Sequence, residues 1–147
     1  MSDIIFYFHL LAAASWVGGA MLLFILGIFL RDKEAQKTVY YYIGPLYGYF
    51  ESVVLTVLLV TGGYMLWDKG LISVFESSGR FSELLWTKLI LVGLITFATI
   101  VHMTISLRAH GRERTMKEKI VSRATSLMIF FLNLVILYFA IQIRNIL

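Results

Sequence analysis

Four long apolar runs take up most of this 147-residue chain, at positions 4–30, 46–67, 84–107 and 124–143. An α-helix needs only about 20 apolar residues to cross the hydrocarbon core of a bilayer. Helices also satisfy their own backbone hydrogen bonds, which lipid cannot do. The runs therefore predict an all-α integral membrane protein, with a single transmembrane domain over residues 1–147 and four helices at these positions.

The composition leaves little of the chain outside the membrane. Hydrophobic residues make up 59% of the sequence, against about 45–50% in soluble domains. The chain has no cysteine, which excludes thiolate metal ligands, iron–sulfur clusters and covalent c-type haem attachment. We therefore expect any chemistry between the helices or at their ends.

The basic residues favour one side of the membrane. The segments after the first and third runs hold nine of them: Arg31, Lys33, Lys37, Arg108, Arg112, Arg114, Lys117, Lys119 and Arg123. The opposite side holds three, Lys69, Arg80 and Arg144. The positive-inside rule then predicts a multi-pass protein of the inner membrane, with both termini on the non-cytoplasmic side. Acidic lipid headgroups account for the basic segments, so no nucleic-acid partner is expected.

The connections indicate how the helices are ordered. Segments of roughly 12–17 residues between the runs favour antiparallel neighbours, and hence an up-down-up-down bundle. Gly44-Pro45 is expected to mark the entry to the second helix. Ala14/Gly18 and Ser15/Gly19 are small-xxx-small pairs in the first helix, and they allow either close helix packing or a flat cofactor against the backbone.

Ionisable residues inside the runs are the best candidates for function, because the bilayer makes them costly. At the helical rise, His9 lies about 7 Å and Lys88 about 6 Å below the same membrane boundary, with Tyr64 near this layer. A neutral imidazole is a good ligand for haem iron or copper, although it can also simply pack at a helix end. Lys88 could ligate iron through a free lone pair, bind a carboxylate, or extend to the headgroups.

A second polar cluster is expected nearer the cytoplasmic side. His102 differs in depth from His9 by about 20 Å, so one iron cannot take both as axial ligands. Glu51 matches His102 in depth. We expect Glu51, His102, Arg108 and Arg123 to form this cluster, as a structural pairing or as a proton relay.

Three segments carry a family resemblance. Residues 8–19, Phe8-His9-Leu10-Leu11-Ala12-Ala13-Ala14-Ser15-Trp16-Val17-Gly18-Gly19, resemble the first helix of the copper resistance protein D (CopD) family. Residues 50–62 resemble its second helix, and Trp86-Thr87-Lys88-Leu89-Ile90-Leu91-Val92 resembles the start of its third. The layout is also similar to that of the HemJ-type protoporphyrinogen oxidases, which are short four-helix proteins.

The resemblance to the HemJ-type proteins implies a b-type haem and a redox reaction within the membrane. It also implies essential roles for the first-helix histidine and the third-helix lysine, which match His9 and Lys88. The Leu-Pro-Arg-Leu-Phe-type motif of that family is absent, because residues 23–31 read Leu-Phe-Ile-Leu-Gly-Ile-Phe-Leu-Arg. The resemblance therefore supports haem binding more strongly than it supports protoporphyrinogen oxidation.

The first hypothesis is a haem b-binding membrane redox protein that performs electron transfer or a porphyrinogen- or quinone-linked oxidation. It makes the chain a candidate oxidoreductase with a quinone or respiratory complex as partner. His9 is an axial ligand, and Lys88 is the second ligand or the anchor of a carboxylate. Trp16 lies two turns from His9 and would pack on the macrocycle, while Arg80 or Arg144 would hold propionates.

Two other hypotheses remain. One is a copper uptake or resistance protein, with His9 and a methionine such as Met65 as copper ligands. The other is a cofactor-free accessory subunit of a membrane complex. In either case the chain could also pair with a second copy of itself.

Overall fold

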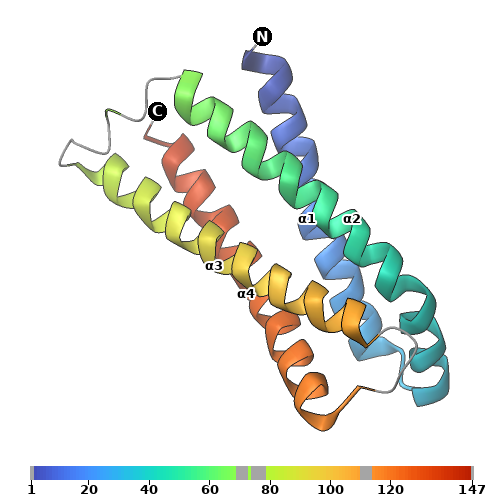
Figure 1. The fold of residues 1–147 in the computed structure, drawn as a ribbon. Helices are drawn as coiled ribbons and strands as arrows, with labels where there is room; N and C mark the ends of the chain where they lie inside the picture. Colours follow the sequence, from blue (N-terminus) through green and yellow to red (C-terminus); the bar gives the residue numbers. More distant parts are fainter. Residues whose placement is uncertain (1, 69–72, 74–78, 110–113, 147) are drawn as a thin grey trace.

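The computed structural model describes residues 2–68, 73, 79–109 and 114–146. They form four helices, α1 (Ser2–Phe29), α2 (Lys33–Asp68), α3 (Arg80–Arg108) and α4 (Met116–Arg144) (Figure 1). Each is long and apolar enough to cross a membrane. The predicted all-α fold with four potential membrane spans is confirmed, while the side of the membrane on which each end lies stays a prediction.

The helices form two pairs. α1 packs along α2 and α3 packs along α4, and the pairs meet less extensively where α1 approaches α4 and α2 approaches α3. Consecutive helices run in opposite directions, so that both termini lie at one end of the bundle (Figure 1). We call this the terminal end. The opposite end carries the α1–α2 connection and the start of α4, and we call it the basic end.

The second helix begins earlier than the sequence indicated. α2 starts at Lys33 and contains Pro45 in its interior, so the prediction that Gly44-Pro45 marks its entry is wrong. Proline lacks a backbone N–H and leaves one carbonyl of the preceding turn without its usual helical donor, a loss that a long packed helix tolerates. The α1–α2 connection is therefore only residues 30–32. The Asp32 carboxylate accepts from the Glu34 backbone N–H at 3.0 Å, as an N-cap does.

The fourth helix also begins earlier, at Met116 rather than 124. Thr115 and Glu118 form a capping box at its start. The Thr115 hydroxyl accepts from the Glu118 backbone N–H at 3.3 Å, and the Glu118 carboxylate accepts from the Thr115 backbone N–H at 2.9 Å. The third connection is correspondingly short, and several of the predicted loop cations lie on the first turns of α4.

One apolar cluster joins all four helices. Its most buried members are Trp16 of α1 and Ile95 and Ala98 of α3, and the others are Ala12, Val54, Leu55 and Ile129. Many large apolar side chains remain exposed on the outside, including Phe6, Leu22, Val60, Phe97 and Phe131. Soluble monomers rarely expose so much contiguous apolar surface. These side chains suit a lipid environment, which supports a membrane location.

Candidate functional site

His9 and Thr61 join the first two helices near the terminal end. The Nδ1 atom of His9 lies 2.7 Å from the Thr61 hydroxyl oxygen. That hydroxyl donates its one hydrogen to the Val57 carbonyl of its own helix, at 2.6 Å. It therefore has only lone pairs to offer to the imidazole, and His9 must be the donor through Nδ1–H.

This bond leaves the other ring nitrogen available. In a neutral imidazole with its proton on Nδ1, Nε2 carries the lone pair. Histidines that ligate metals in proteins commonly donate the second ring N–H to a neighbouring oxygen, as His9 does to Thr61. Gly62 makes room for the ring, since a Cβ there would lie 3.3 Å from His9 Cε1. The ring is thus held with its ligating nitrogen free.

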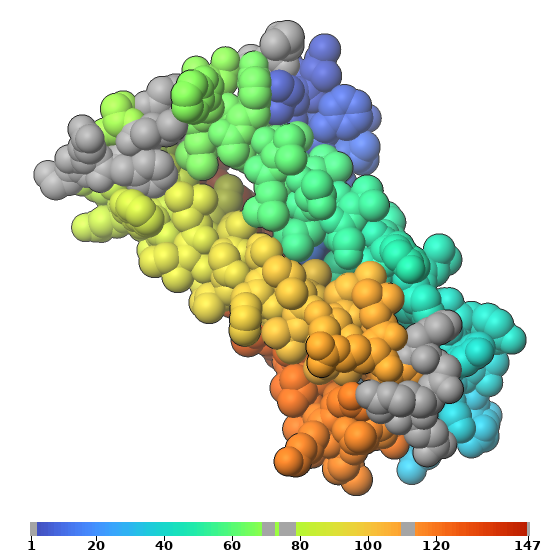
Figure 2. Space-filling model, in the orientation of Figure 1, coloured from blue at the N-terminus to red at the C-terminus, as the bar shows by residue number. Residues whose placement is uncertain are grey.

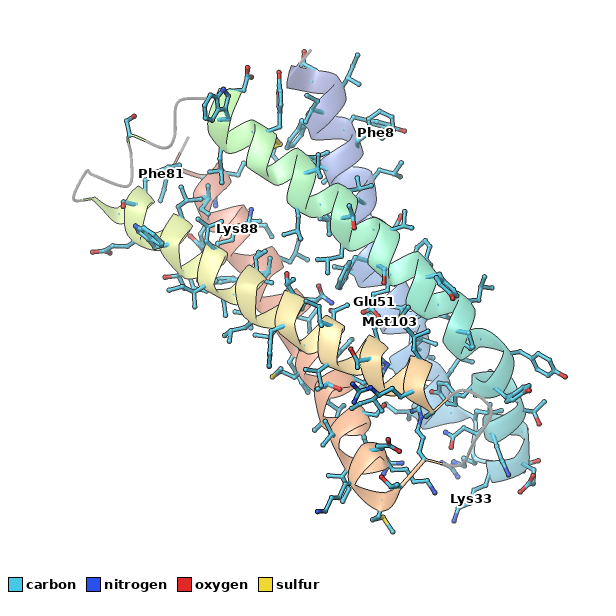
Figure 3. All side chains as sticks on the ribbon, viewed as in Figure 1. Phe8, Lys33, Glu51, Phe81, Lys88 and Met103 are labelled. Atoms are coloured by element: carbon cyan, nitrogen blue, oxygen red, sulfur yellow. The ribbon has the colours of Figure 1, made fainter. Side chains whose placement is uncertain are left out.

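Lys88 of α3 belongs to the same region. It is half-buried, and its charge is near enough to His9 for a long-range electrostatic effect. Figure 3 shows Lys88 in the terminal half of α3. Figure 2 shows a hollow between α2 and α3 in the same half of the bundle. His9 and Lys88 therefore lie in the same half of the bundle, and their joint role stays a prediction.

The other residues predicted for this region are distributed differently. Trp16 is 3% exposed and packs in the apolar cluster, so in this structure it lies against protein. Tyr64 is half-buried on α2, one turn beyond Thr61. Arg80 and Arg144 are exposed, at the first residue of α3 and the last residue of α4. Both arginines therefore lie at the terminal end, where they could reach an anionic group at the membrane surface.

The second histidine lies in a network between α3 and α4. His102 Nδ1 is 3.4 Å from both the Ser122 and the Thr125 hydroxyl oxygens. Ser122 also accepts from the Arg114 guanidinium at 3.1 Å, and Arg114 reaches the Ser106 hydroxyl at 3.4 Å. The structure thus places His102 with hydroxyls and Arg114, at the basic end.

The remaining members of the expected inner cluster do not join this network. Arg108 and Arg123 are exposed. Glu51 is 5% exposed on α2 and has no hydrogen-bond or ion-pair partner among the described residues. Thr61 was expected only as a hydroxyl at the depth of His9 and Lys88, and the sequence analysis did not connect Arg114, Ser122 and Thr125 with His102. For Ser122 and Thr125 the sequence offered one indication, since they lie three residues apart and therefore on one face of a helix.

A metal cage of protein ligands is not found in the part of the chain that the structure describes. No group of three or more His, Cys, Asp or Glu side chains is placed to hold an ion there. A haem differs in this respect, since its iron takes four ligands from the macrocycle and only one or two from the protein. A single histidine such as His9, whose Nδ1 contacts Thr61, fits that smaller requirement.

The chain is similar to a protein of Aquifex aeolicus described as an uncharacterized protein. The two are 24% identical over 151 residues, which cover 98% of this chain and 96% of the relative. The similarity therefore extends through all four helices. No protein-family model matches the chain. No solved structure matches it either.

Proposed function

We propose that this protein is a haem b-binding membrane redox protein, with His9 as an axial ligand of the iron. One observation carries the proposal: His9 donates Nδ1–H to Thr61 and keeps Nε2 free. This is the arrangement of a metal-ligating histidine with its orienting partner. The other half-buried histidine, His102, has no such short bond.

Lys88 supports the proposal as the neighbouring cation of His9. Two roles follow from its chemistry. A neutral amine supplies a lone pair and would be the second iron ligand, whereas an ammonium ion binds a carboxylate such as a haem propionate or an acidic substrate. Arg80 and Arg144 at the terminal end would hold further carboxylates near the membrane surface.

A bound haem supplies one-electron chemistry, with a potential set by its axial ligands and by the polarity of its surroundings. This chain would orient the ligand through Thr61, exclude water with the apolar cluster, and hold negative groups with Lys88. An electron partner such as a quinone or respiratory complex would approach within the membrane. The resemblance to HemJ-type proteins makes porphyrinogen oxidation a candidate reaction.

The orientation in the membrane is part of the proposal. The basic end carries Arg31, Lys33, Lys37 and the cations around the start of α4, and the terminal end carries far fewer. The positive-inside rule then puts the basic end in the cytoplasm and both termini on the other side of an inner membrane. The haem would lie in the half of the bundle away from the cytoplasm.

The test is haem content. We expect the protein purified in detergent from haem-sufficient cells to contain stoichiometric haem b by the pyridine haemochrome assay. His9→Ala should remove that haem while the protein remains folded and helical by circular dichroism. A colourless wild-type protein, or a His9→Ala variant with undiminished haem, would contradict the proposal.

A further inference from the structure

Glu51 is the most buried ionisable side chain of the transmembrane helices, and the proposed haem site does not use it. It is 5% exposed in the middle of α2, and no described residue forms a hydrogen bond or an ion pair with it. A carboxylate without a cation beside it is costly in such surroundings, whereas a neutral carboxylic acid is far less so. Intramembrane acids of this kind commonly mark proton-binding sites.

The position of Glu51 on α2 follows from its neighbours. Gly48, Glu51, Ser52 and Leu55 lie on one face of the helix, by the spacing of three and four residues. Gly48 approaches α3 closely, since a Cβ there would lie 2.8 Å from Met103 Sδ. Ser52 and Leu55 line a groove between α2 and α3 together with Thr99 and Met103. Glu51 therefore lies near α3 at the level of Thr99 and Met103, and Figure 3 shows it beside Met103.

Three further buried polar groups lie in or next to the apolar cluster that joins the four helices, and they have no hydrogen-bond partner among the described residues. They are the indole Nε1 of Trp16, the hydroxyl of Thr99 and the amide Nδ2 of Asn133, each in a residue at most 8% exposed. Trp16 belongs to the cluster, Thr99 follows its member Ala98, and Asn133 lies one turn beyond its member Ile129. Together with Glu51, these groups provide one buried polar residue on each of the four helices.

Buried polar groups are nearly always hydrogen-bonded, and internal water commonly supplies the missing partner. Trp16 and Asn133 are unpaired donors, Glu51 offers acceptor oxygens, and Thr99 can act as either. A water molecule needs two to four such partners, and these groups are of the right kinds. Indole and amide N–H donors suit water and a carboxyl better than a metal cation, because an N–H group would oppose a cation.

We propose that Glu51 is a proton-binding group in the centre of the bundle, served by internal water that Trp16, Thr99 and Asn133 hold. A water-borne proton adds to a Glu51 carboxylate oxygen and leaves water behind, and the reverse step returns it. The proposal does not rest on haem binding and holds equally for a protein without a cofactor.

Few other ionisable groups face Glu51 from the helices around it. Tyr47 lies one turn earlier on α2 and interacts electrostatically with Glu51. On α3, His102 is one turn beyond Thr99, and Lys88 lies three turns away toward the terminal end. The ionisable side chains described on α1 lie near its start, and those of α4 are exposed except Glu118, which is half-buried in the first turn at the basic end. No cation among the described residues is therefore placed to neutralise a Glu51 carboxylate.

Polar side chains extend from the basic end toward the level of Glu51. Thr99, His102 and Ser106 lie on one face of α3, and Ser122 and Thr125 of α4 lie opposite His102. These groups continue between α3 and α4 to Arg114 near the start of α4. The route predicts that the Glu51 proton exchanges with solvent although the side chain is buried.

The experiment is infrared spectroscopy of the purified full-length protein in membranes, in H2O and in D2O. We expect a C=O stretching band of a protonated carboxyl that shifts in D2O and is lost in Glu51→Gln. Glu83→Gln, which changes an exposed acid in the first turn of α3, should leave that band in place. Asn133→Leu and Thr99→Val should shift the band, because they remove partners of the proposed water.

Two results would overturn the proposal. One is the absence of any protonated-carboxyl band that depends on Glu51, which would make this residue ionised. The other is a Glu51 band that does not shift in D2O, which would make it a sealed acid without access to water. If Glu51→Gln does not fold, Glu51→Asp serves instead, because the shorter acid keeps the carboxyl and moves its band.

Discussion

The half-buried histidines His9 and His102 differ in how closely a neighbouring hydroxyl approaches the ring. His9 meets a hydroxyl whose hydrogen is already donated elsewhere, at 2.7 Å, so Nδ1 is the donor and Nε2 is free. His102 Nδ1 lies 3.4 Å from the hydroxyl oxygens of both Ser122 and Thr125, and the Thr125 hydroxyl also donates to its own helix, at the Val121 carbonyl. Nδ1–H can therefore donate in both histidines, but only the contact of His9 is short.

The difference lies in how firmly each ring is oriented. The contact of 2.7 Å between His9 and Thr61 orients the His9 ring, whereas His102 has two longer contacts of 3.4 Å. The nearby cations also differ. Lys88 lies in the same half of the bundle as His9, whereas Arg114 contacts two serine hydroxyls. The proposed function therefore puts the ligand at the terminal end, and the network at the basic end is sufficient for helix packing.

Replacement of Lys88 is the prediction with the largest expected effect. Lys88→Met should remove most of the bound haem or change its Soret band, because it deletes the second ligand or anchor. Lys88→Arg separates the two roles, since arginine keeps the charge but does not ligate iron. Lys117→Met, at an exposed lysine of the basic end, should leave the spectrum unchanged. A normal haem content in Lys88→Met would remove Lys88 from the site.

Thr61→Val tests the orienting hydrogen bond. Loss of such a partner typically weakens metal binding by about 10–100-fold, and we expect a haem loss of this order by titration of the apoprotein. Thr56→Val is the matched control, because Thr56 also donates to its own helix backbone, at 2.8 Å, but is exposed and away from His9. Equal behaviour of the two variants would contradict the assigned role of Thr61.

Two adjacent glycines test how tightly α1 packs on α2 toward the basic end. A Cβ at Gly19 would lie 2.9 Å from the Tyr47 ring, whereas nothing lies within 4 Å of one at Gly18. Gly19→Ala should lower the free energy of unfolding by about 1–3 kcal/mol through overpacking. Gly18→Ala should leave it unchanged or raise it by up to about 1 kcal/mol, since alanine favours the helix. Denaturation in mixed detergent micelles measures both, and equal effects would argue against this helix contact.

The smallest expected effect concerns the capping box at the start of α4. Thr115→Ala removes the hydroxyl that accepts from Glu118 N–H, which should cost about 1 kcal/mol of stability. The haem spectrum should not change, because this cap belongs to the basic end. Thr115→Ser keeps the hydroxyl and should retain the stability. A change in the haem spectrum of Thr115→Ala would show that the start of α4 affects the proposed haem site, and it would contradict our treatment of the two ends as independent.

The fold was largely predictable because four apolar runs leave few alternatives in lipid. The helix ends were harder to predict. The predicted start of α2 relied on Pro45, but the long helix contains this proline in its interior. The start of α4 did have a local signal, the Thr115-x-x-Glu118 capping box, but it lies outside the apolar run. Hydropathy marks where a helix meets lipid and says little about how far it continues into water.

The depth of side chains was easier to predict than their partners. The helical rise put His9, Lys88 and Thr61 at one level, and the structure pairs His9 with Thr61 at 2.7 Å. That pairing could not be predicted, because it depends on which face of α2 meets α1. The same applies to His102, which was expected beside Glu51 and instead contacts Ser122 and Thr125. A single sequence predicts how deep a residue lies along a helix. Its partners depend on how the helix is rotated about its axis, which the sequence alone does not give.

The most direct measurement is a dithionite-reduced minus oxidised absorption spectrum of the wild-type protein, His9→Ala and His102→Ala, purified side by side. If the terminal end holds the haem, the wild type and His102→Ala show the sharp α and Soret bands of a reduced b-type haem, and His9→Ala shows none. Retention of the bands in His9→Ala, or their loss in His102→Ala alone, would contradict the assignment of the two histidines.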